Sequence, residues 1–259
     1  MSTALLQARG LGRDFGGLRA VDALAFDVHA GQIKALIGPN GAGKSTTLAM
    51  IAGALAPTRG SLRFEGRPLP VGRPHVVVAR GIARTFQLVL PFGDMSVLET
   101  VLVGCDRAGR AGWARCAFRT PAMRREERGL RAQAGELLAL VGLEHRAGLS
   151  AAALPYGEQR LLDVARALAT TPRLLLLDEP GAGLNAEERA RLAAVIRAVR
   201  ARGTTVLLVD HHVAFVMDLA DEVLVLCHGE KLAEGAPARV RRDPAVVAAY
   251  VGDDEDAPC

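Results

Sequence analysis

Short apolar runs of strand length recur along the chain. Such runs are IKALIG at 33–38, RLLLLDE at 173–179 and TTVLLVD at 204–210, and each ends at a glycine or at an acidic residue. Continuous apolar runs are typical of strands that are buried on both faces of a sheet. Stretches with helical spacing lie between them, so the order of elements predicts right-handed crossovers and an α/β fold with a mostly parallel sheet.

Two regions depart from this alternation of strands and helices. Near the N-terminus, short apolar runs alternate with turns as far as HAGQ at 29–32, which predicts an antiparallel β region. Residues 94–150 are too rich in charged and helix-forming residues for a sheet, so we expect a mostly helical subdomain inserted at about 90–165. Residues 4–252 are expected to form a single domain, followed by an acidic tail at 253–259.

The composition limits the classes of function. None of the apolar runs approaches the ~18 residues that a membrane span needs, and the start MSTALLQARG lacks the features of a secretory signal, so any membrane role should be peripheral. A net charge of +4 with dispersed arginine favours a solvated surface over a nucleic-acid interface. The four cysteines lack CxxC spacing, which favours reduced thiols over a disulfide framework or a zinc site.

One lysine stands in an unusual context. The chain has 32 basic residues, but its lysines are Lys34, Lys44 and Lys231, and Lys44 lies inside the glycine-rich stretch GPNGAGKSTT. This stretch fits G-x-x-x-x-G-K-[ST] between a predicted strand and a predicted helix, where backbone N–H groups and a helix N-terminus can cradle phosphates. A slim ammonium can reach the β- and γ-phosphates as a point charge, whereas a guanidinium is wider. A glycine-rich turn without a ligand is the weaker alternative, and Lys34 and Lys231 are expected at the surface.

We expect the whole phosphate loop to contact a nucleotide, with Ser45 supplying a hydroxyl to Mg²⁺. The residues concerned are Gly38, Pro39, Asn40, Gly41, Ala42, Gly43, Lys44, Ser45 and Thr46. The run RLLLLDE delivers Asp178 and Glu179 to the edge of the sheet, where Asp178 can hold Mg²⁺ through water and Glu179 can polarise an attacking water. Two solvated acidic residues at a strand end are common in proteins without serving any function. Their occurrence together with Lys44 favours a nucleotide-binding site instead.

A phosphate loop alone does not name a function, and the segment LPYGEQR at 154–160 decides between the candidates. Here the chain resembles the ABC transporter ATP-binding family, in which an LSGGQ-like signature opens a helix shortly before the acidic strand. Leu154, Gly157 and Gln159 keep its outline. Pro155 stands where the family commonly has Ser, which removes a hydroxyl that the family uses on the γ-phosphate bound by the second subunit, although proline is tolerated near a helix start.

The resemblance implies roles for three further side chains. Phe15, in DFGGLRAVD, matches the aromatic residue that stacks on adenine, and Gln87, in RTFQ, matches the lid glutamine that senses Mg²⁺ and water. His211, in LLVDHHVAF, matches the switch histidine that contacts the γ-phosphate. Without the resemblance, each would more often be an ordinary loop residue. We expect no metal site at His211 and His212, because neighbouring residues at a strand end point apart.

For the whole protein, the resemblance implies an ATPase that works as a head-to-tail dimer, homomeric or heteromeric, with two ATP molecules and Mg²⁺ between its subunits. The signature around Gly157 of one subunit would cap the ATP of the other. The implied partners are membrane permease subunits and, indirectly, a periplasmic solute-binding protein. The implied location is peripheral, at the cytoplasmic face of the plasma membrane, and no nucleic acid is implied as a partner.

Within the family, the segments FGGLRAVD, RTFQ, RTPAMRR and GAPARVRRDPAVVAAYVG are similar to those of ATPases of branched-chain amino acid importers. ATPases of importers for urea or short-chain amides share much of this pattern and are the near alternative. A non-transport ABC ATPase is a further alternative, although such proteins usually carry two cassettes or a long coiled-coil insert. The solute itself is not expected to be encoded in this subunit, because the solute does not touch it.

Overall fold

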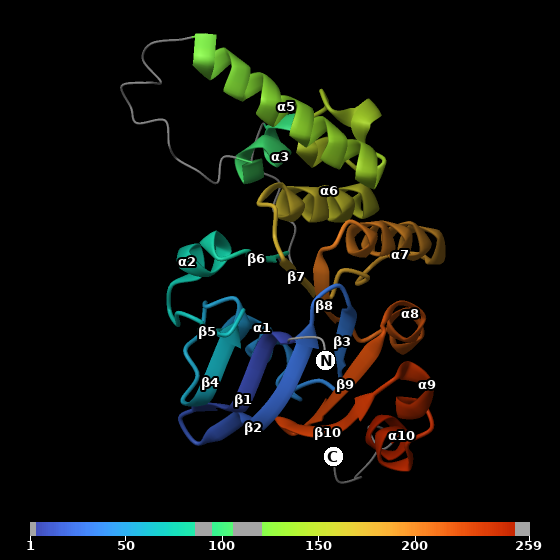
Figure 1. The fold of residues 1–259 in the computed structure, drawn as a ribbon. Coiled ribbons are helices and arrows are strands. Elements are labelled where there is room, and N and C mark those ends of the chain that lie inside the picture. The colour runs from blue at the N-terminus through green and yellow to red at the C-terminus, as the bar shows by residue number, and fades with distance from the viewer. Residues whose placement is uncertain (1–3, 86–94, 106–120, 252–259) are drawn as a thin grey trace. The chain divides into compact units, whose positions relative to one another are not determined.

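The computed structural model describes residues 4–85, 95–105 and 121–251 (Figure 1). The chain divides into two compact units, one formed by residues 1–84 and 173–259 and the other by residues 85–172. The second unit is thus an insertion within the first, and it contains the segment at about 90–165 for which we expected a helical subdomain.

The first unit contains a six-stranded, mostly parallel sheet. Its strands, in spatial order, are β10 (Glu230–Gly235), β9 (Glu222–Cys227), β3 (Ile33–Ile37), β8 (Thr205–Val209), β7 (Leu174–Asp178) and β6 (Ile82–Arg84). Neighbouring strands run parallel except β9 and β10. Every residue of β3, β7 and β8 is buried, so these are the strands that the three continuous apolar runs predicted.

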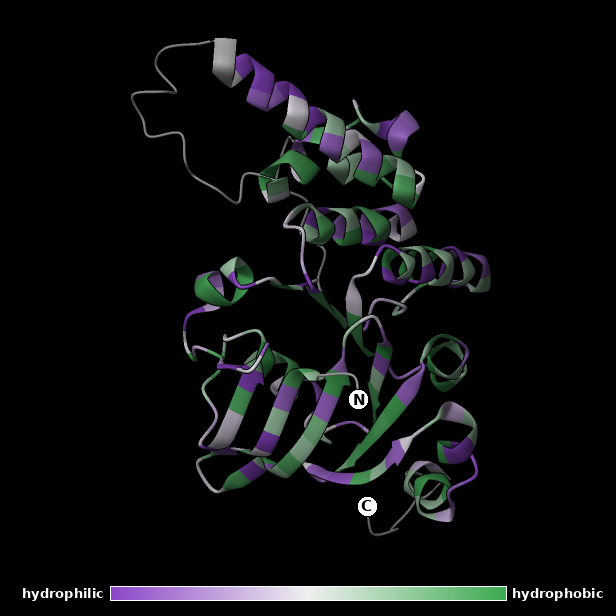
Figure 2. Ribbon diagram, in the orientation of Figure 1, coloured by the Kyte–Doolittle hydropathy of each residue, from purple (hydrophilic) through white to green (hydrophobic). Residues whose placement is uncertain are grey.

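A four-stranded antiparallel sheet forms the other β region of the first unit. Its strands, in spatial order, are β2 (Leu18–His29), β1 (Ala4–Phe15), β4 (Arg59–Phe64) and β5 (Arg67–Pro68). Hydrophobic and hydrophilic residues alternate along its long strands (Figure 2), and Leu6, Val21 and Phe64 are among the buried apolar residues. The predicted α/β fold with an N-terminal antiparallel β region is therefore confirmed.

Helices connect the strands of the first unit. Those that the structure describes are α1 (Lys44–Ile51), α2 (Pro74–Ala79), α7 (Ala186–Ala201), α8 (Val213–Leu219), α9 (Pro237–Val240) and α10 (Pro244–Val251). The longest, α7, begins with a capping box in which the side chains of Asn185 and Glu188 each accept a hydrogen bond from the other residue's main-chain N–H. It ends just before Gly203, whose φ of 91° stops the helix.

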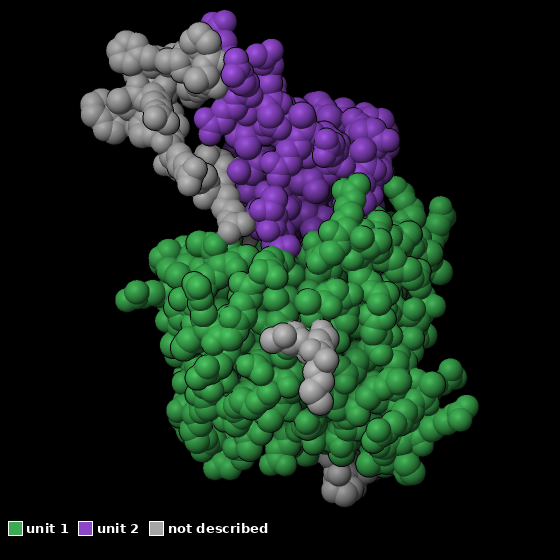
Figure 3. Space-filling view, viewed as in Figure 1, with its two compact units in different colours: residues 1–84, 173–259 green, residues 85–172 purple. Residues whose placement is uncertain are grey.

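The second unit, coloured purple in Figure 3, is mainly helical among its described residues, as predicted. Its main described helices are α3 (Val97–Cys105), α5 (Pro121–Val141) and α6 (Tyr156–Ala169), and single 3₁₀ turns lie at Glu144–Arg146 and Ala151–Ala153. A Cβ atom at Gly104 would lie 2.4 Å from the Arg166 carbonyl oxygen, so α3 packs directly on α6 through glycine. No helix among the described residues is long and apolar enough to cross a membrane.

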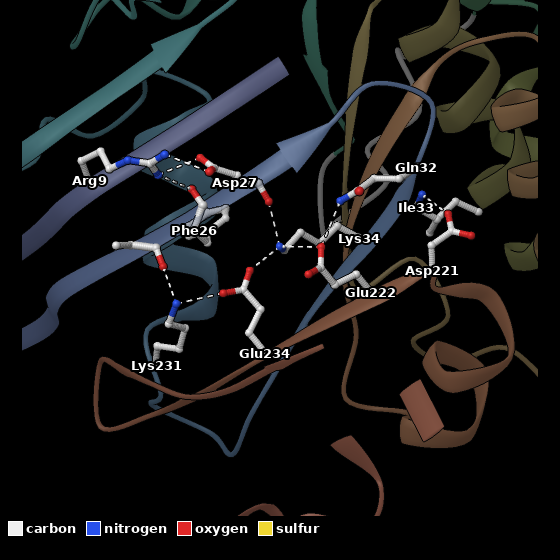
Figure 4. Close-up of polar contacts among 11 residues, drawn as sticks. Arg9, Phe26, Asp27, Gln32, Ile33, Lys34, Asp221, Glu222, Lys231 and Glu234 are labelled. Atoms are coloured by element: carbon white, nitrogen blue, oxygen red, sulfur yellow. Dashed lines mark hydrogen bonds and ion pairs between the residues drawn. The ribbon is translucent and has the colours of Figure 1, made fainter. Parts of the chain in front are cut away.

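Within the first unit, the two sheets meet at a buried lysine (Figure 4). Lys34, on β3, is 1% exposed. Its ammonium donates to the main-chain oxygen of Asp27 on β2 at 2.7 Å, to Glu222 on β9 at 3.0 Å and to Glu234 on β10 at 2.5 Å. The prediction that Lys34 lies at the surface is therefore wrong. Burial of its charge is tolerated because each of its three N–H groups finds an acceptor.

Lys231, which is exposed as expected, completes this contact between the sheets. Its ammonium donates to the Ala25 main-chain oxygen on β2 and to Glu234, both at 2.9 Å, so Glu234 accepts from two lysines. We call Lys34, Lys231 and Glu234 the lysine junction. Because β2 and β10 are terminal strands of their sheets, the lysine junction joins two sheet edges through side chains. A cavity of about 400 Å³ is lined by the lysine junction together with Arg9, Ala25, Phe26, Asp27, His29 and Glu222.

The prediction of reduced thiols is met at only one of the two cysteines that the structure describes. Cys105 is free and buried, and burial raises the pKa of its thiol. Cys227, at the end of β9, is disulfide-bonded. Disulfides depend on the positions of cysteines in space, which spacing along the sequence does not reveal.

Candidate nucleotide-binding site

The loop between β3 and α1 needs the glycines that its sequence supplies. Gly38, Gly41 and Gly43 have positive φ, at 151°, 80° and 93°. A Cβ atom at Gly38 would lie 2.2 Å from the Leu226 carbonyl oxygen, and one at Gly43 would lie 2.4 Å from the Ala20 carbonyl oxygen. Both would clash with main chain, so the close approach of β9 and β2 to the loop requires glycine at both positions.

The loop leads into the N-terminus of α1. Gly43 is the N-cap, and no side chain of the described residues caps this end. The N–H groups of the first turn and the positive end of the helix dipole are therefore left without a protein oxygen in the capping position. Ser45, in the same turn, is exposed. This arrangement favours an anion with several oxygens, such as a phosphate.

Lys44 lies against the loop that precedes it. Its side chain is buried, at 6% exposure, and its ammonium donates to the carbonyl oxygens of Gly38 and Pro39, both at 2.7 Å. Burial lowers the pKa of Lys44, while the nearby charges of Glu179 and Asp178 oppose that shift. The ammonium is thus held in the loop by neutral acceptors, and a phosphate would supply the opposite charge that they lack.

The acidic pair lies at the carboxyl end of β7. Asp178 is 2% exposed, and its Oδ2 accepts from Nη2 of Arg84, at the end of the neighbouring strand β6, at 2.6 Å. Glu179 has a φ of 45°, a conformation that is costly for a residue with a Cβ, and its N–H donates to the Val209 carbonyl oxygen at 2.7 Å. Strained non-glycine residues cluster at functional sites, which agrees with the predicted catalytic role of Glu179.

His211 follows β8 and faces the acidic pair. Its exposed ring places Nδ1 3.9 Å from Oε2 of Glu179. Beside it, Asp210 is completely buried, and its carboxylate accepts from the main-chain N–H groups of His212 at 2.8 Å and Gly181 at 3.0 Å. Asp210 therefore joins the loop after β8 to the loop after β7. We did not predict this role, although the acid that ends TTVLLVD repeats the pattern of RLLLLDE and was a usable signal.

Of the remaining predicted residues, the structure describes Phe15 and Gly157 but not Gln87. Phe15, at the tip of the β1–β2 hairpin, is exposed, and the guanidinium carbon of Arg13 lies 4.6 Å from its ring centre. Gly157 is buried at the start of α6 in the second unit, where Pro155 is the N-cap. Gln87 lies outside the described residues. The structure thus brings together the phosphate loop, Asp178, Glu179 and His211 within the first unit, and leaves the roles of the other residues as predictions.

The residues present fit a magnesium ion that binds together with phosphates. Among the described residues, no group of three or more His, Cys, Asp and Glu side chains could hold a metal by itself. Mg²⁺ at nucleotide sites typically takes one or two protein oxygens and completes its shell with phosphate oxygens and water. The buried carboxylate of Asp178 and the exposed hydroxyl of Ser45 are oxygens of this kind.

Comparison with known proteins supports the same reading. The sequence profile of the ABC transporter family matches residues 21–182, which is more than half of the chain. The chain belongs to the ABC transporter family of ATP-binding proteins. A second profile, described as branched-chain amino acid ATP-binding cassette transporter, matches residues 230–256. Membership in this family confirms the predicted ATP binding and ATPase activity.

Relatives of this ABC ATPase match it from end to end. The high-affinity branched-chain amino acid transport ATP-binding protein BraF of Pseudomonas aeruginosa is 40% identical over 254 residues, covering 98% of this chain and 100% of BraF. The corresponding protein LivG of Escherichia coli is 38% identical over 255 residues, with the same coverage of both chains. The segments that carried the resemblance are therefore parts of a similarity along the full length.

Solved structures of ABC ATPases share its fold. A nucleotide-free ATP-binding cassette from an ABC transporter is 30% identical, has a TM-score of 0.82 and covers 96% of this chain and 100% of its own. An ATP-binding cassette in its ADP conformation is 29% identical, has a TM-score of 0.84 and covers 97% of this chain and 100% of its own. The second of these structures shows that a close structural neighbour binds an adenine nucleotide.

Proposed function

We propose that this ABC ATPase is the ATP-hydrolysing subunit of an importer for branched-chain amino acids. The observation that carries the proposal is the identity of 38–40% with BraF and LivG over 98% of the chain. The separate match of residues 230–256 to the branched-chain amino acid transporter profile supports it. No comparison favours an importer for urea or short-chain amides, or a non-transport ABC ATPase.

In this proposal the phosphate loop holds the triphosphate of ATP. The main-chain N–H groups that the loop from Gly38 to Thr46 has at every position except Pro39, and the ammonium of Lys44, would bind the phosphate oxygens, and the uncapped start of α1 supports this role. Ser45 and Asp178, with Gln87, would hold the Mg²⁺ that neutralises charge on the β- and γ-phosphates. Phe15 would stack on the adenine, for which its exposed ring at the hairpin tip is suited.

Hydrolysis would depend on the two loops that Asp210 joins. Glu179 would polarise the attacking water, and His211 would contact the γ-phosphate and orient the reacting groups. The distance of 3.9 Å between His211 Nδ1 and Glu179 Oε2 supports the assignment of both side chains to one site. The second subunit of the dimer would cap the nucleotide with the main-chain N–H groups around its own Gly157, since Pro155 provides no hydroxyl.

The partners follow from the same proposal. Two such ATPase subunits, identical or different, would bind at the cytoplasmic face of the plasma membrane to permease subunits, which a periplasmic solute-binding protein supplies with solute. Uptake into vesicles that contain the whole transporter tests the solute. Labelled leucine should accumulate with ATP and not without it. Uptake of labelled urea without uptake of leucine would instead establish the alternative importer.

The substitution Glu179→Gln tests the chemistry of the proposed site. It removes the base and keeps the shape, so we expect ATP to bind as before while hydrolysis falls by about 100-fold or more. Turnover of labelled ATP and equilibrium nucleotide binding measure the two effects. Glu187→Gln, which changes an exposed acid in the first turn of α7, is the matched control and should leave both quantities unchanged. Retained hydrolysis in Glu179→Gln would show that another residue is the base.

A further inference from the structure

Arg84 is placed by its strand to reach the acidic pair. It is the last residue of β6, which runs parallel to β7 and lies at the end of the six-stranded sheet. The register pairs Arg84 with Leu176, two residues before Asp178. Because the carboxyl ends of parallel strands meet at the same edge, a long side chain at this position extends toward the end of β7.

Arg84 makes a short contact with Asp178, but one of its nitrogens has no hydrogen-bond partner among the described residues. Nη2 of Arg84 lies 2.6 Å from Oδ2 of Asp178, and the carboxylate is almost entirely buried whereas the arginine side chain is 23% exposed. Nε of Arg84 is buried and has no hydrogen-bond partner among the described residues. A buried donor without a partner is unfavourable, so the guanidinium is not held by a full set of fixed partners.

This contact places the positive charge of Arg84 beside the Asp178 carboxylate, which we propose as a ligand of Mg²⁺. The guanidinium of Arg84 stands at hydrogen-bond distance from a buried carboxylate, where a charge-assisted hydrogen bond is strong. The same guanidinium repels a second cation that approaches the carboxylate, because like charges a few ångströms apart in a poorly hydrated site interact strongly. Arg84 therefore has two opposed effects on a metal at this site. It fixes the position of the Asp178 carboxylate, and its positive charge weakens the attraction of that carboxylate for a metal ion.

We propose that Arg84 is a positioning residue that sets how strongly ATP binding depends on Mg²⁺. The inference rests on the proposed function, in which Asp178 and Ser45 hold Mg²⁺ beside ATP. Without magnesium, Arg84 offsets the charge of Asp178, which would otherwise repel the negatively charged nucleotide. With magnesium, the ion and Arg84 share one carboxylate, so the gain in ATP affinity that Mg²⁺ provides is limited.

The substitution Arg84→Gln tests this inference through binding instead of turnover. ATP affinity is measured at equilibrium on the full chain at pH 8, once with Mg²⁺ and once with EDTA. The ratio of the two affinities should rise by about threefold or more, because ATP without magnesium binds more weakly and Mg²⁺ no longer meets the charge of Arg84 at the carboxylate. A merely structural role would weaken both affinities together and leave the ratio unchanged, which would overturn the inference.

Two further variants test whether the positive charge at position 84 is responsible for the change in the ratio. Arg84→Lys keeps a positive charge and should return the ratio to near the wild-type value. Arg63→Gln changes an exposed arginine on β4, whose guanidinium bonds only to the Gly66 carbonyl oxygen among the described residues, and should leave the ratio unaltered. If wild-type protein binds no ATP, the proposed function fails. If it binds ATP with a magnesium-dependent gain that Arg84→Gln does not alter, the inference about Arg84 alone fails.

Should Arg84→Gln not fold, the wild-type protein still provides a test. The Arg84 Nε–H group can be followed by NMR after assignment through the Arg84→Lys variant, in which its signal disappears. The signal should move more on addition of ATP with Mg²⁺ than on addition of ATP with EDTA, since only the first changes the partner of Asp178. Equal or absent shifts would overturn the inference.

Discussion

Lys34 lies on β3 and Lys44 at the start of α1, and the two lysines have different surroundings. Both side chains are buried, at 1% and 6% exposure. Lys34 donates to two carboxylates and a carbonyl oxygen, so its charge is matched inside the fold. Lys44 donates to two carbonyl oxygens, and among the described residues no carboxylate lies within hydrogen-bond distance of it.

The difference lies in the acceptors: the acceptors of Lys34 include carboxylates, whereas those of Lys44 are neutral carbonyl oxygens. The acceptors around Lys34 come from three different strands, so the ion pairs stabilise the way the sheets meet. Burial lowers the pKa of Lys44, which means that its ammonium is held at some expense of stability, and in the proposed function a phosphate would supply the missing opposite charge. The same substitution at both positions should therefore have opposite consequences.

The largest expected effect is on nucleotide binding by Lys44→Met. Loss of the ammonium that meets the phosphates should lower ATP affinity by about 100-fold, equivalent to about 2.7 kcal/mol. Without nucleotide, the free energy of unfolding should stay the same or rise, because methionine removes a poorly matched buried charge and keeps the length of the stem. Equilibrium binding and denaturant unfolding measure the two quantities.

Lys231→Met is the control for this comparison, since it changes an exposed lysine outside the phosphate loop and should leave ATP affinity intact. A Lys44→Met protein that binds ATP normally would contradict the assignment of the loop. A Lys44→Met protein that is clearly less stable than wild type without nucleotide would contradict the inference that the charge of Lys44, unlike that of Lys34, does not stabilise the fold.

The next largest effect is on stability, through Lys34→Met. Removal of one partner from a buried ion-pair network is strongly destabilising, and since Glu222 and Glu234 are partly exposed we expect a loss of about 2 kcal/mol in the free energy of unfolding. ATP affinity of the folded protein should change by less than about twofold, because the phosphate loop keeps its own contacts. Unaltered stability would show that the lysine junction does not join the sheets.

The smallest expected effect is a pH dependence at the lysine junction. Burial raises the pKa of Glu234, but hydrogen bonds from Lys34 and Lys231 together outweigh burial and hold that pKa below its ordinary value of 4.5. A carboxylate with a lowered pKa in the folded state contributes stability that is fully present above about pH 4.5 and is lost as the pH falls through the folded pKa.

The variant Glu234→Gln isolates this contribution. It should be less stable than wild type by about 1 kcal/mol at pH 7, and the difference should shrink as the pH falls below about 4.5. Denaturant unfolding of both proteins at several pH values measures the difference. A difference that stays constant down to about pH 3 would mean that the charge of Glu234 plays no part.

Local patterns were sufficient to predict the strands and the phosphate loop. The strands β3, β7 and β8 are continuous apolar runs, and the conformations at Gly38 and Gly43 need glycine for reasons that the motif already implies. These features depend on neighbours in sequence, so a pattern of a few residues is enough.

Features that depend on neighbours in space were missed. Lys34 was expected at the surface because nothing near it in sequence shows that Glu222 and Glu234 surround it. The contact of Arg84 with Asp178 spans 94 positions and exists because β6 pairs with β7. Such contacts follow from the order of strands in the sheet, which periodicity and spacing along the chain do not determine.

The buried carboxylate of Asp210 has a mechanical consequence for the two side chains assigned to hydrolysis. The carboxylate accepts hydrogen bonds from the main chain of both adjoining segments, at Gly181 and at His212. These bonds connect the segment that carries Glu179 to the segment that carries His211. A displacement of either segment would therefore strain the hydrogen bond that Asp210 makes to the other. The relative alignment of Glu179 and His211 is thus set in part by hydrogen bonds within the fold itself.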